Sequence, residues 1–260
     1  MTDLFDLTGK CAVVVGGAGG IGQAIAEGFA EAGAQVMISS RNIDSLLRAT
    51  GEVKEKTGLD LIYSVCDACI EDQVTELLAA AIGAMGKVDI LCNAQGYNKK
   101  YPGTEFPTDE WDMMFDINVK SIMLTSKHFG KYMIENGIHG KIINLSSVRG
   151  QRAVGNGGVG SVGYCATKGA VDMLTKAYAS DLRPNIQVNA IGPTITYTPM
   201  MVGILPDDAG LRNAKASALP AMRIGDVNDC KGPAIFLASA ASDFITGSTI
   251  YPDGGLMAIG

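Results

Sequence analysis

The sequence predicts a single α/β domain built on one doubly wound parallel sheet, with helices packed on both faces. Short apolar runs rich in β-branched residues alternate with stretches of helical composition along all 260 residues, without a linker or an internal repeat. The residues with recognisable chemistry follow the ends of those apolar runs, and sites in such sheets lie at the carboxyl ends of the strands. We therefore expect residues 1–260 to form one domain.

The alternation assigns the elements in chain order. Strands are expected at 11–15, 35–39, 59–65, 88–92, 141–145, 186–191 and 248–251. Helices are expected at 23–32, 43–56, 71–85, 111–136 (as one or two helices), 162–182 and 229–240. Weak periodicity with several prolines and glycines marks the segment around 194–220, which we interpret as a substrate-side lid.

Composition and charge exclude several classes of protein. The chain is 47% hydrophobic and 18% charged, as in ordinary globular domains, and its net charge of −6 argues against a nucleic-acid partner. We find no signal peptide at the first residues and no apolar run that could span a membrane. The six scattered cysteines fit a reduced, cytoplasmic protein. Cys66 and Cys69 have metal-site spacing, but they lack a second pair, so we expect no metal.

A glycine-rich turn follows the first predicted strand. Residues 16–22 read Gly-Gly-Ala-Gly-Gly-Ile-Gly and lead directly into a helical stretch. Glycines let the backbone approach a pyrophosphate, and the N-terminus of the following helix offers free N–H groups and a positive dipole end. The turn therefore predicts a dinucleotide site with Gly16, Gly20, Ile21 and Gly22 as contacts.

The end of the second predicted strand bears on the choice of cofactor. An NAD-selective site places an acidic residue there, whereas this chain has Ser40 and Arg41. A guanidinium beside a small hydroxyl suits a 2′-phosphate. We therefore expect NADP(H) to be preferred and NAD(H) to remain possible, although Arg41 could also be a solvated residue that opens the next helix.

Tyr164 and Lys168 are four residues apart in a predicted helix and so share one face. An ammonium one turn away favours a phenolate, so we expect Lys168 to lower the pKa of Tyr164. Six glycines in the preceding run can bring the hydroxyl of Ser147 back toward Tyr164. These three side chains suit proton exchange with a carbonyl or alcohol oxygen. Asn118, on an apolar helical stretch, is either a satisfied core amide or a residue that orders a water or a carbonyl.

With these motifs, the chain resembles the classical short-chain dehydrogenase/reductase family, a Rossmann-type fold, over essentially its whole length. The matching residues are Gly16, Gly20, Gly22, Asp67, Asn93, Ala94, Asn118, Ser147, Tyr164, Lys168, Gly192, Pro193, Thr198, Asp253, Gly254 and Gly255. Within the family it is similar to the gluconate 5-dehydrogenase (5-ketogluconate reductase) group, through the segments 3–10, 104–111 and 185–189.

The resemblance implies a role for each of these positions. Tyr164 is the proton donor or acceptor, Lys168 holds the nicotinamide ribose, Ser147 binds the substrate oxygen, and Asn118 fixes a water. The remaining cofactor contacts that it implies are Asp67, Ala68, Asn93, Ala94, Pro193, Thr194, Ile195 and Thr198. Family members are usually homotetramers, so we expect one here.

Four cations adjoin the predicted cleft of this acidic protein. Arg149 and Arg152 follow Ser147, and Lys99 and Lys100 follow the fourth predicted strand. They suit a carboxylate substrate, unless they are solvated loop charges. The predicted activity is hydride transfer between NADP(H) and a secondary alcohol or ketone of a sugar acid or polyol. The alternatives are a 3-oxoacyl-carrier or other small-ketone reductase and, outside enzymes, a nucleotide-sensing binding protein.

Overall fold

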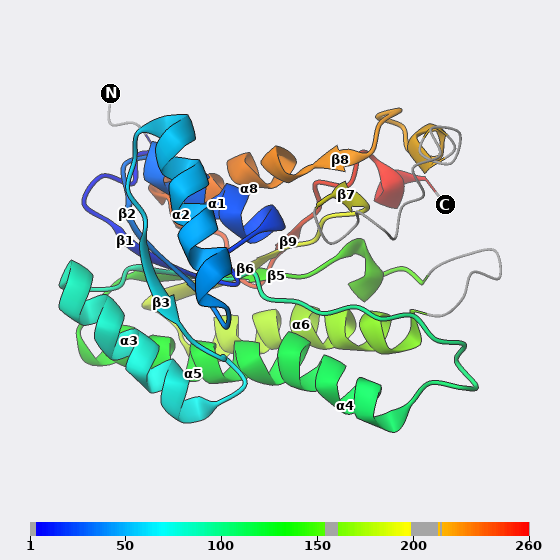
Figure 1. The fold of residues 1–260 in the computed structure, drawn as a ribbon, viewed down its shortest axis with the longest axis horizontal. Coiled ribbons are helices and arrows are strands. Elements are labelled where there is room, and N and C mark those ends of the chain that lie inside the picture. The colour runs from blue at the N-terminus through cyan, green and yellow to red at the C-terminus, as the bar shows by residue number, and fades with distance from the viewer. Residues whose placement is uncertain (1–3, 154–160, 199–212, 214, 260) are drawn as a thin grey trace.

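A computed structural model describes residues 4–153, 161–198, 213 and 215–259, and its centre is a parallel sheet (Figure 1). The sheet has the order β3-β2-β1-β4-β5-β6-β9. Its strands are β1 (Cys11–Val15), β2 (Gln35–Ser40), β3 (Ile62–Val65), β4 (Ile90–Asn93), β5 (Gly140–Leu145), β6 (Ile186–Ile191) and β9 (Thr249–Ile250). Every neighbouring pair is parallel. The predicted doubly wound parallel sheet is therefore confirmed.

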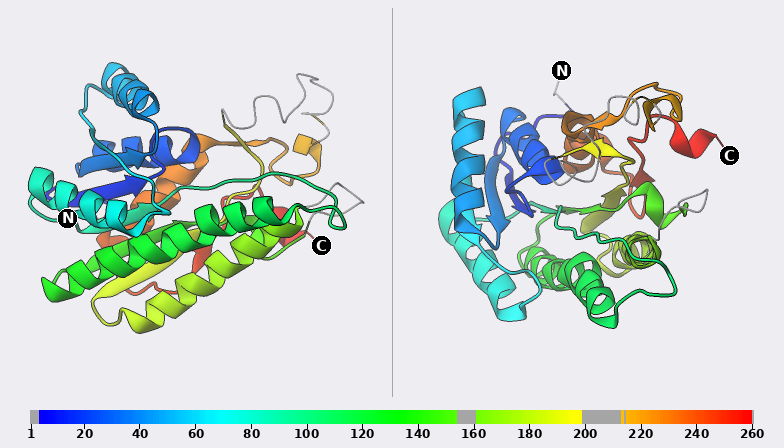
Figure 2. Two further views of the ribbon diagram at one scale, coloured as in Figure 1. Left: turned by 60° about the horizontal axis from the view of Figure 1, so that its bottom comes forward. Right: turned by 45° about the vertical axis from the view of Figure 1, so that its right-hand side comes forward.

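Helices cover both faces of the sheet (Figure 2). The helices on one face are α1 (Gly20–Glu31), α2 (Ile43–Thr57) and α8 (Lys231–Ala238), and those on the other face are α3 (Glu71–Met85), α4 (Thr108–Phe115), α5 (Ser121–Glu135) and α6 (Val162–Asp181). In Figure 1 and in the right-hand view of Figure 2, α5 and α6 lie side by side below the sheet.

Strand β1 shows how the sequence produces these layers. All five of its residues are buried, and they alternate between two apolar cores. Ala12 and Val14 face the core that includes Phe29 of α1, whereas Val13 and Val15 face the core that includes Phe129 of α5. A strand buried on both faces must be apolar throughout, which explains the unbroken run of hydrophobic residues.

The order of the strands reverses between β1 and β4. The chain winds from β1 through β2 to β3 on one side, and from β4 through β5 to β6 on the other. The crevice at such a switch point, outside the carboxyl ends of the strands, is where ligands bind in open α/β sheets. The glycine turn follows β1, and Ala94 follows β4, so both lie at this crevice.

The structure differs from the predicted elements mainly at their ends. Instead of one or two regular helices over 111–136, α4 and α5 are joined by a π-helical turn, Asp116–Lys120. The helix predicted at 229–240 is shorter, because Val227–Cys230 form a 3-10 turn before α8 begins. A short strand pair, β7 (Thr196–Tyr197) with β8 (Gly225–Asp226), was not predicted.

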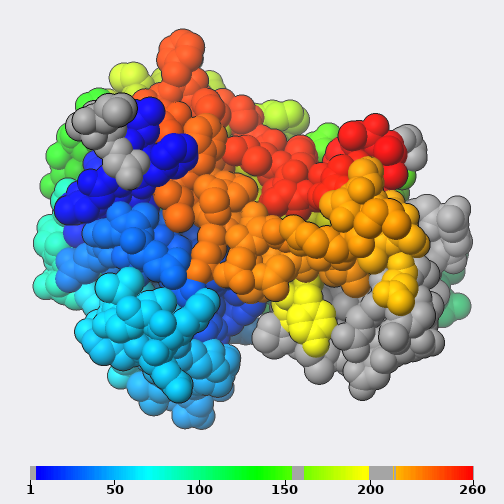
Figure 3. Space-filling model, turned by 90° about the horizontal axis from the view of Figure 1, so that it is seen from above, coloured from blue at the N-terminus to red at the C-terminus, as the bar shows by residue number. Residues whose placement is uncertain are grey.

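The β7–β8 pair lies at the base of the segment predicted as a lid. Figure 3 shows the yellow residues of β7 against the orange residues of β8. Residues 199–212 and 214 lie outside the described residues, so the lid around 194–220 stays a prediction. No helix within the described part of the chain is both long and apolar enough to cross a membrane.

Candidate active site

The glycine turn packs too closely against neighbouring backbone to admit side chains at two of its positions. A Cβ at Gly16, where φ is +78°, would lie 2.6 Å from the backbone nitrogen of Gln95. A Cβ at Gly22 would lie 2.2 Å from the carbonyl oxygen of Gly16. The N-terminus of α1, at Gly20, has no side-chain cap. A tight turn ahead of an uncapped helix N-terminus fits a dinucleotide pyrophosphate.

Other predicted cofactor residues surround this turn. Thr198 lies over Gly20, because a Cβ at Gly20 would be 3.6 Å from the Cβ of Thr198. Asp67 shapes the end of β3: its Oδ1 accepts from the backbone N–H of Cys69 at 3.0 Å. Ala68 between them is buried. The structure thus places Thr198 against the glycine turn and Asp67 at the carboxyl end of β3.

Arg41 is exposed at the end of β2. Burial raises the pKa of Cys69 to about 12, and the charge of Arg41 opposes this rise. The half-buried Ser40 precedes it and accepts a 3.5 Å hydrogen bond from the backbone of Asn42. A second cation here was missed by the sequence analysis. Arg48 on α2 donates to the carbonyl of Ala18 at 3.1 Å and so reaches the glycine turn.

The side chain of Asn93 does not face the crevice. It is fully buried, accepts from Thr125 at 2.7 Å and donates to Asn144 at 2.9 Å. Because these partners lie on α5 and β5, the Asn93 amide links β4 to both of these elements inside the protein. Only its backbone and that of Ala94, whose N–H donates to Val15, lie at the strand end.

Ser147, Tyr164 and Lys168 come together as predicted. The Ser147 hydroxyl hydrogen-bonds Tyr164 and lies 3.2 Å from the carbonyl oxygen of Pro193. The Lys168 ammonium donates to the carbonyl of Leu145 at 2.7 Å and lies 5.5 Å from the centre of the Tyr164 ring. The carboxyl end of β5 thus lies against the N-terminal part of α6.

The predicted direction of the Tyr164 pKa was wrong for this arrangement. Burial raises the pKa of Tyr164 to about 12, and the hydrogen bond from Ser147 opposes this only in part. Lys168 does not offset the burial, because its ammonium is directed to Leu145 and lies over the ring rather than beside the hydroxyl. Lys168 is itself only 2% exposed, and burial lowers its pKa to about 8. The phenol is therefore protonated at neutral pH, as a proton donor requires.

Asn118 lies in the π-helical turn and is fully buried. Its Oδ1 accepts from the backbone N–H of Tyr97 at 2.7 Å, and its Nδ2 donates to the carbonyl of Tyr97 at 2.8 Å and to Thr167 at 3.0 Å. The amide is thus satisfied and fixes the loop after β4 against α6. The π turn changes the helical register at this residue, and π turns are frequent at functional sites.

The four predicted substrate cations have different surroundings. Lys99 forms an ion pair with Glu110, which also accepts from Tyr97 at 2.8 Å, so the charge of Lys99 is neutralised locally. Lys100 is exposed. Arg152 donates to the carbonyls of Leu256 and Ile259 at 2.8 and 2.9 Å, which anchors the C-terminal segment.

Of these four cations, Arg149 is the one whose charge acts on Tyr164. Its charge acts to lower the pKa values of both Tyr164 and Cys165, while its Nη1 donates to the carbonyl of Ala153 at 2.9 Å. Residues 154–160 of the lengthened loop lie outside the described part. Of the four cations, Arg149 is therefore the one whose placement suits contact with a substrate anion.

Sequence reasoning missed residues that support the site through backbone or buried contacts. Gly96 leaves space between Asn118 and Lys168: a Cβ there would be 3.8 Å from Oδ1 and 4.0 Å from Nζ. Asp172, one turn after Lys168, is buried and accepts from Gln151 at 2.8 Å. No motif marks these positions, although the helical spacing of Lys168 and Asp172 was visible.

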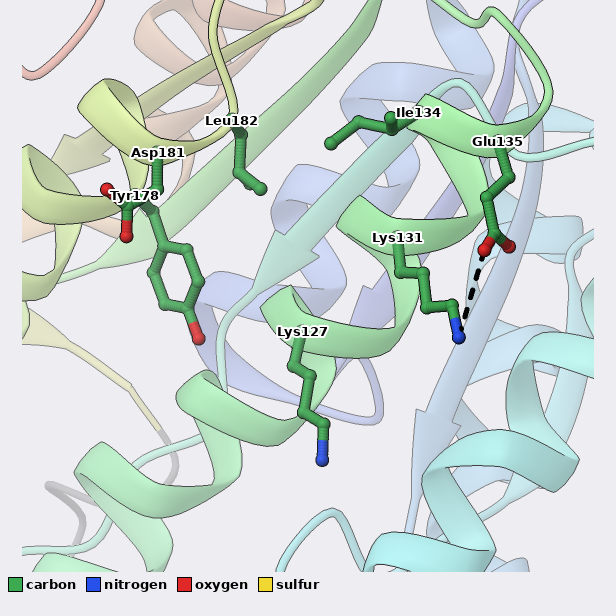
Figure 4. A pocket seen from close by; sticks show the side chains of 7 residues that line it. All are labelled: Lys127, Lys131, Ile134, Glu135, Tyr178, Asp181 and Leu182. Atoms are coloured by element: carbon green, nitrogen blue, oxygen red, sulfur yellow. Dashed lines mark ion pairs between the residues drawn. The ribbon is translucent and has the colours of Figure 1, made fainter.

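Among the hollows lined by described residues are two. One, of about 420 Å³, lies between α5 and α6 and is lined by Lys131, Glu135 and Tyr178 among others (Figure 4). Tyr178 is 14 residues beyond Tyr164 on the same helix, about 21 Å along its axis. The other, of about 180 Å³, is lined by Thr194, Arg223 and Asp229 among others. Ile195, beside Thr194, accepts from the backbone of Gly225. Among the described residues, no group of acidic, histidine or cysteine side chains could hold a metal ion.

Comparison with known proteins finds relatives over nearly the whole chain. A family model described as enoyl-(acyl carrier protein) reductase matches residues 16–257. The chain is 36% identical to gluconate 5-dehydrogenase of Gluconobacter oxydans, covering 98% of this chain and 97% of that one. It is 35% identical to 2-dehydro-3-deoxy-D-gluconate 5-dehydrogenase of Formosa agariphila, covering 98% and 96%. The crystal structure of a gluconate 5-dehydrogenase from Burkholderia cenocepacia, in complex with NADP and tartrate, superposes with a TM-score of 0.89 at 35% identity and covers 99% of both chains.

Proposed function

Since the chain belongs to the short-chain dehydrogenase/reductase family and is an oxidoreductase acting on CH–OH groups, we propose that its substrate is a sugar acid. In the proposed reaction, hydride passes between NADP(H) and a secondary alcohol or ketone. The observation that carries this proposal is that Ser147, Tyr164 and Lys168 lie close together near the glycine turn. The names of the similar dehydrogenases support the substrate class.

The residues divide the work of the proposed reaction. The bound nicotinamide supplies or accepts the hydride. The Tyr164 hydroxyl, protonated at neutral pH, gives its proton to the carbonyl oxygen in reduction and regains it in oxidation. Ser147, which hydrogen-bonds Tyr164, orients that oxygen. Lys168 would provide a buried ammonium for the nicotinamide ribose. Asn118 holds the backbone of Tyr97 against the hydroxyl of Thr167, the residue before Lys168.

The charge of the substrate can be tested directly. We expect a keto sugar that bears a carboxylate to be reduced with higher kcat/KM than its neutral analogue. The reaction is followed by the absorbance of NADPH at 340 nm. The advantage should shrink with added salt, since exposed charges are screened over about 8–10 Å. Arg149→Gln should raise KM for the acid alone. Arg152→Gln is the matched control and should affect both substrates alike, because that side chain holds the C-terminal segment.

The same panel of ketones separates the alternatives. A preference for 3-oxoacyl thioesters or small neutral ketones would contradict the sugar-acid proposal. Binding of NADPH without turnover of any ketone would favour a nucleotide-sensing protein.

Arg41 is proposed to select NADP(H). Its guanidinium is exposed at the end of β2, so the loss of one charged hydrogen bond should be partly screened. We expect Arg41→Ala to lower kcat/KM for NADPH about tenfold and to leave the value for NADH nearly unchanged. An unaltered ratio of the two values would remove Arg41 from cofactor selection.

We also propose a cytoplasmic homotetramer. Exposed apolar side chains on the α4–α6 layer, including Met113, Ile134, Val162 and Met173, offer a surface for another subunit. All six cysteines are free thiols, which fits a reducing compartment. Light scattering of the purified protein tests the assembly, and a monomer would contradict it.

A further inference from the structure

A carboxylate lies buried one helical turn beyond Lys168. Asp172 is 4% exposed and Lys168 is 2% exposed, and both belong to α6. Residues four apart in a helix are neighbours on one face. An ionised group in the interior is costly unless an opposite charge or several hydrogen bonds compensate it. Lys168 and Asp172 thus place opposite charges in the interior one helical turn apart.

Other elements hold the carboxylate through neutral donors. Its Oδ2 accepts from the Gln151 amide at 2.8 Å, and its Oδ1 accepts from the Thr249 hydroxyl at 3.5 Å. A Cβ at Gly150 would lie 2.3 Å from the Asp172 Oδ2 and 2.9 Å from the Lys168 carbonyl oxygen. The glycine therefore allows its turn to pack closely against α6. That turn, Val148–Gly150, is capped by Ser147.

The charged and titratable groups around the pair are few in the part of the chain that the structure describes. On α6, Lys168 interacts electrostatically with Asp172, and the Lys168 ammonium lies over Tyr164. Beyond β9, burial raises the pKa of Tyr251, and the charge of Asp172 adds to this rise. From the turn after Ser147, the charge of Arg149 acts on Tyr164 and Cys165. Among these residues, the cation that the charge of Asp172 affects is thus Lys168.

We propose that Asp172 is a positioning residue of the reaction, whose buried carboxylate keeps Lys168 in the charged form. This inference rests on the proposed function, because it assigns the Lys168 ammonium to the nicotinamide ribose. Gln151 and Thr249 hold the carboxylate in place, and Gly150 allows the turn that carries Ser147 to pack directly on it.

The sign of the effect follows from the charges. Burial lowers the pKa of Lys168 to about 8, and the negative charge of Asp172 opposes this shift. The pKa of Tyr164 is about 12, so Lys168 is the first of the two to lose its proton as pH rises. Loss of the ammonium therefore sets the alkaline limb of the activity profile. Without the carboxylate the pKa of Lys168 falls, and the limb moves to lower pH.

The experiment measures kcat/KM for ketone reduction between pH 6 and 10 in the wild type and in Asp172→Asn. We expect the alkaline limb of Asp172→Asn to lie about one pH unit lower, with the rate at the acidic plateau much less affected. Asp172→Ser, a second uncharged variant, must show the same shift, so a folding failure of one leaves the other as the test. Asp172→Glu keeps the charge and should keep the limb at its wild-type pH.

Two matched variants remove a hydrogen bond to Asp172 and retain its charge. Gln151→Met and Thr249→Val should keep the limb within a few tenths of a pH unit of wild type. An unmoved limb in the uncharged variants, or an equal shift in these two controls, would overturn the proposal. Failure of the wild type to reduce any ketone would instead contradict the proposed function, so the two failures are distinguishable.

Discussion

Replacing Tyr164 with phenylalanine is expected to lower kcat for ketone reduction about 10²–10⁴-fold, the usual contribution of general acid–base catalysis. Phenylalanine keeps the ring over which the Lys168 ammonium lies, and it removes only the hydroxyl that hydrogen-bonds Ser147. NADPH binding, measured by fluorescence titration, should therefore change by no more than a few-fold.

The same helix offers a matched control. The Tyr178 hydroxyl donates to the carbonyl of Met123 at 3.1 Å, far along α6 from the catalytic groups. Tyr178→Phe should keep kcat within about twofold of wild type while losing about 1 kcal/mol of stability. Activity of Tyr164→Phe close to that of Tyr178→Phe would remove Tyr164 from the reaction.

The second large effect is expected from Gly22→Ala. The new methyl group would lie 2.2 Å from the Gly16 carbonyl oxygen and 3.1 Å from the Ala94 side chain, so the glycine turn must move. Overpacking of this kind costs about 1–3 kcal/mol of folding free energy. Because the turn forms the proposed pyrophosphate cradle, we also expect the Kd for NADPH to rise at least about tenfold.

Gly83→Ala makes the same chemical change inside α3, at a position where a Cβ meets no atom within 4 Å. Alanine is the better helix former, so this variant should gain about 0.5–1 kcal/mol and bind NADPH normally. Urea unfolding of both variants measures the stabilities. Equal NADPH affinities in the two variants would show that the turn tolerates a side chain.

Sequence patterns predicted the central strands and the main helices because those elements are buried on both faces or have regular spacing. The runs at 11–15 and 186–191 agree with β1 and β6 residue for residue. The π turn at Asp116–Lys120 was not predictable, because its i→i+5 hydrogen bonds leave no signature in the hydrophobic period. The β7–β8 pair was missed because two-residue strands have no detectable alternation.

The candidate site was predicted unevenly for a related reason. Motifs identified the groups that meet at strand ends, such as Ser147 and Tyr164, because their chemistry is distinctive. The environment of each group depends on tertiary packing. The pairing of Lys99 with Glu110, the burial of the Asn93 amide and the raised pKa of Tyr164 all follow from neighbours that are distant in sequence.

The π turn between α4 and α5 limits how the length of this chain can change. Deleting one residue between positions 108 and 135 would allow a regular α-helix, but every side chain on one side of the deletion would rotate about 100° relative to those on the other. Asn118 could then not meet Tyr97 and Thr167 together. In functional descendants of this sequence, insertions and deletions should therefore be confined to the loops. In an engineered chimera, the junction between the two parent sequences must lie outside this helical segment.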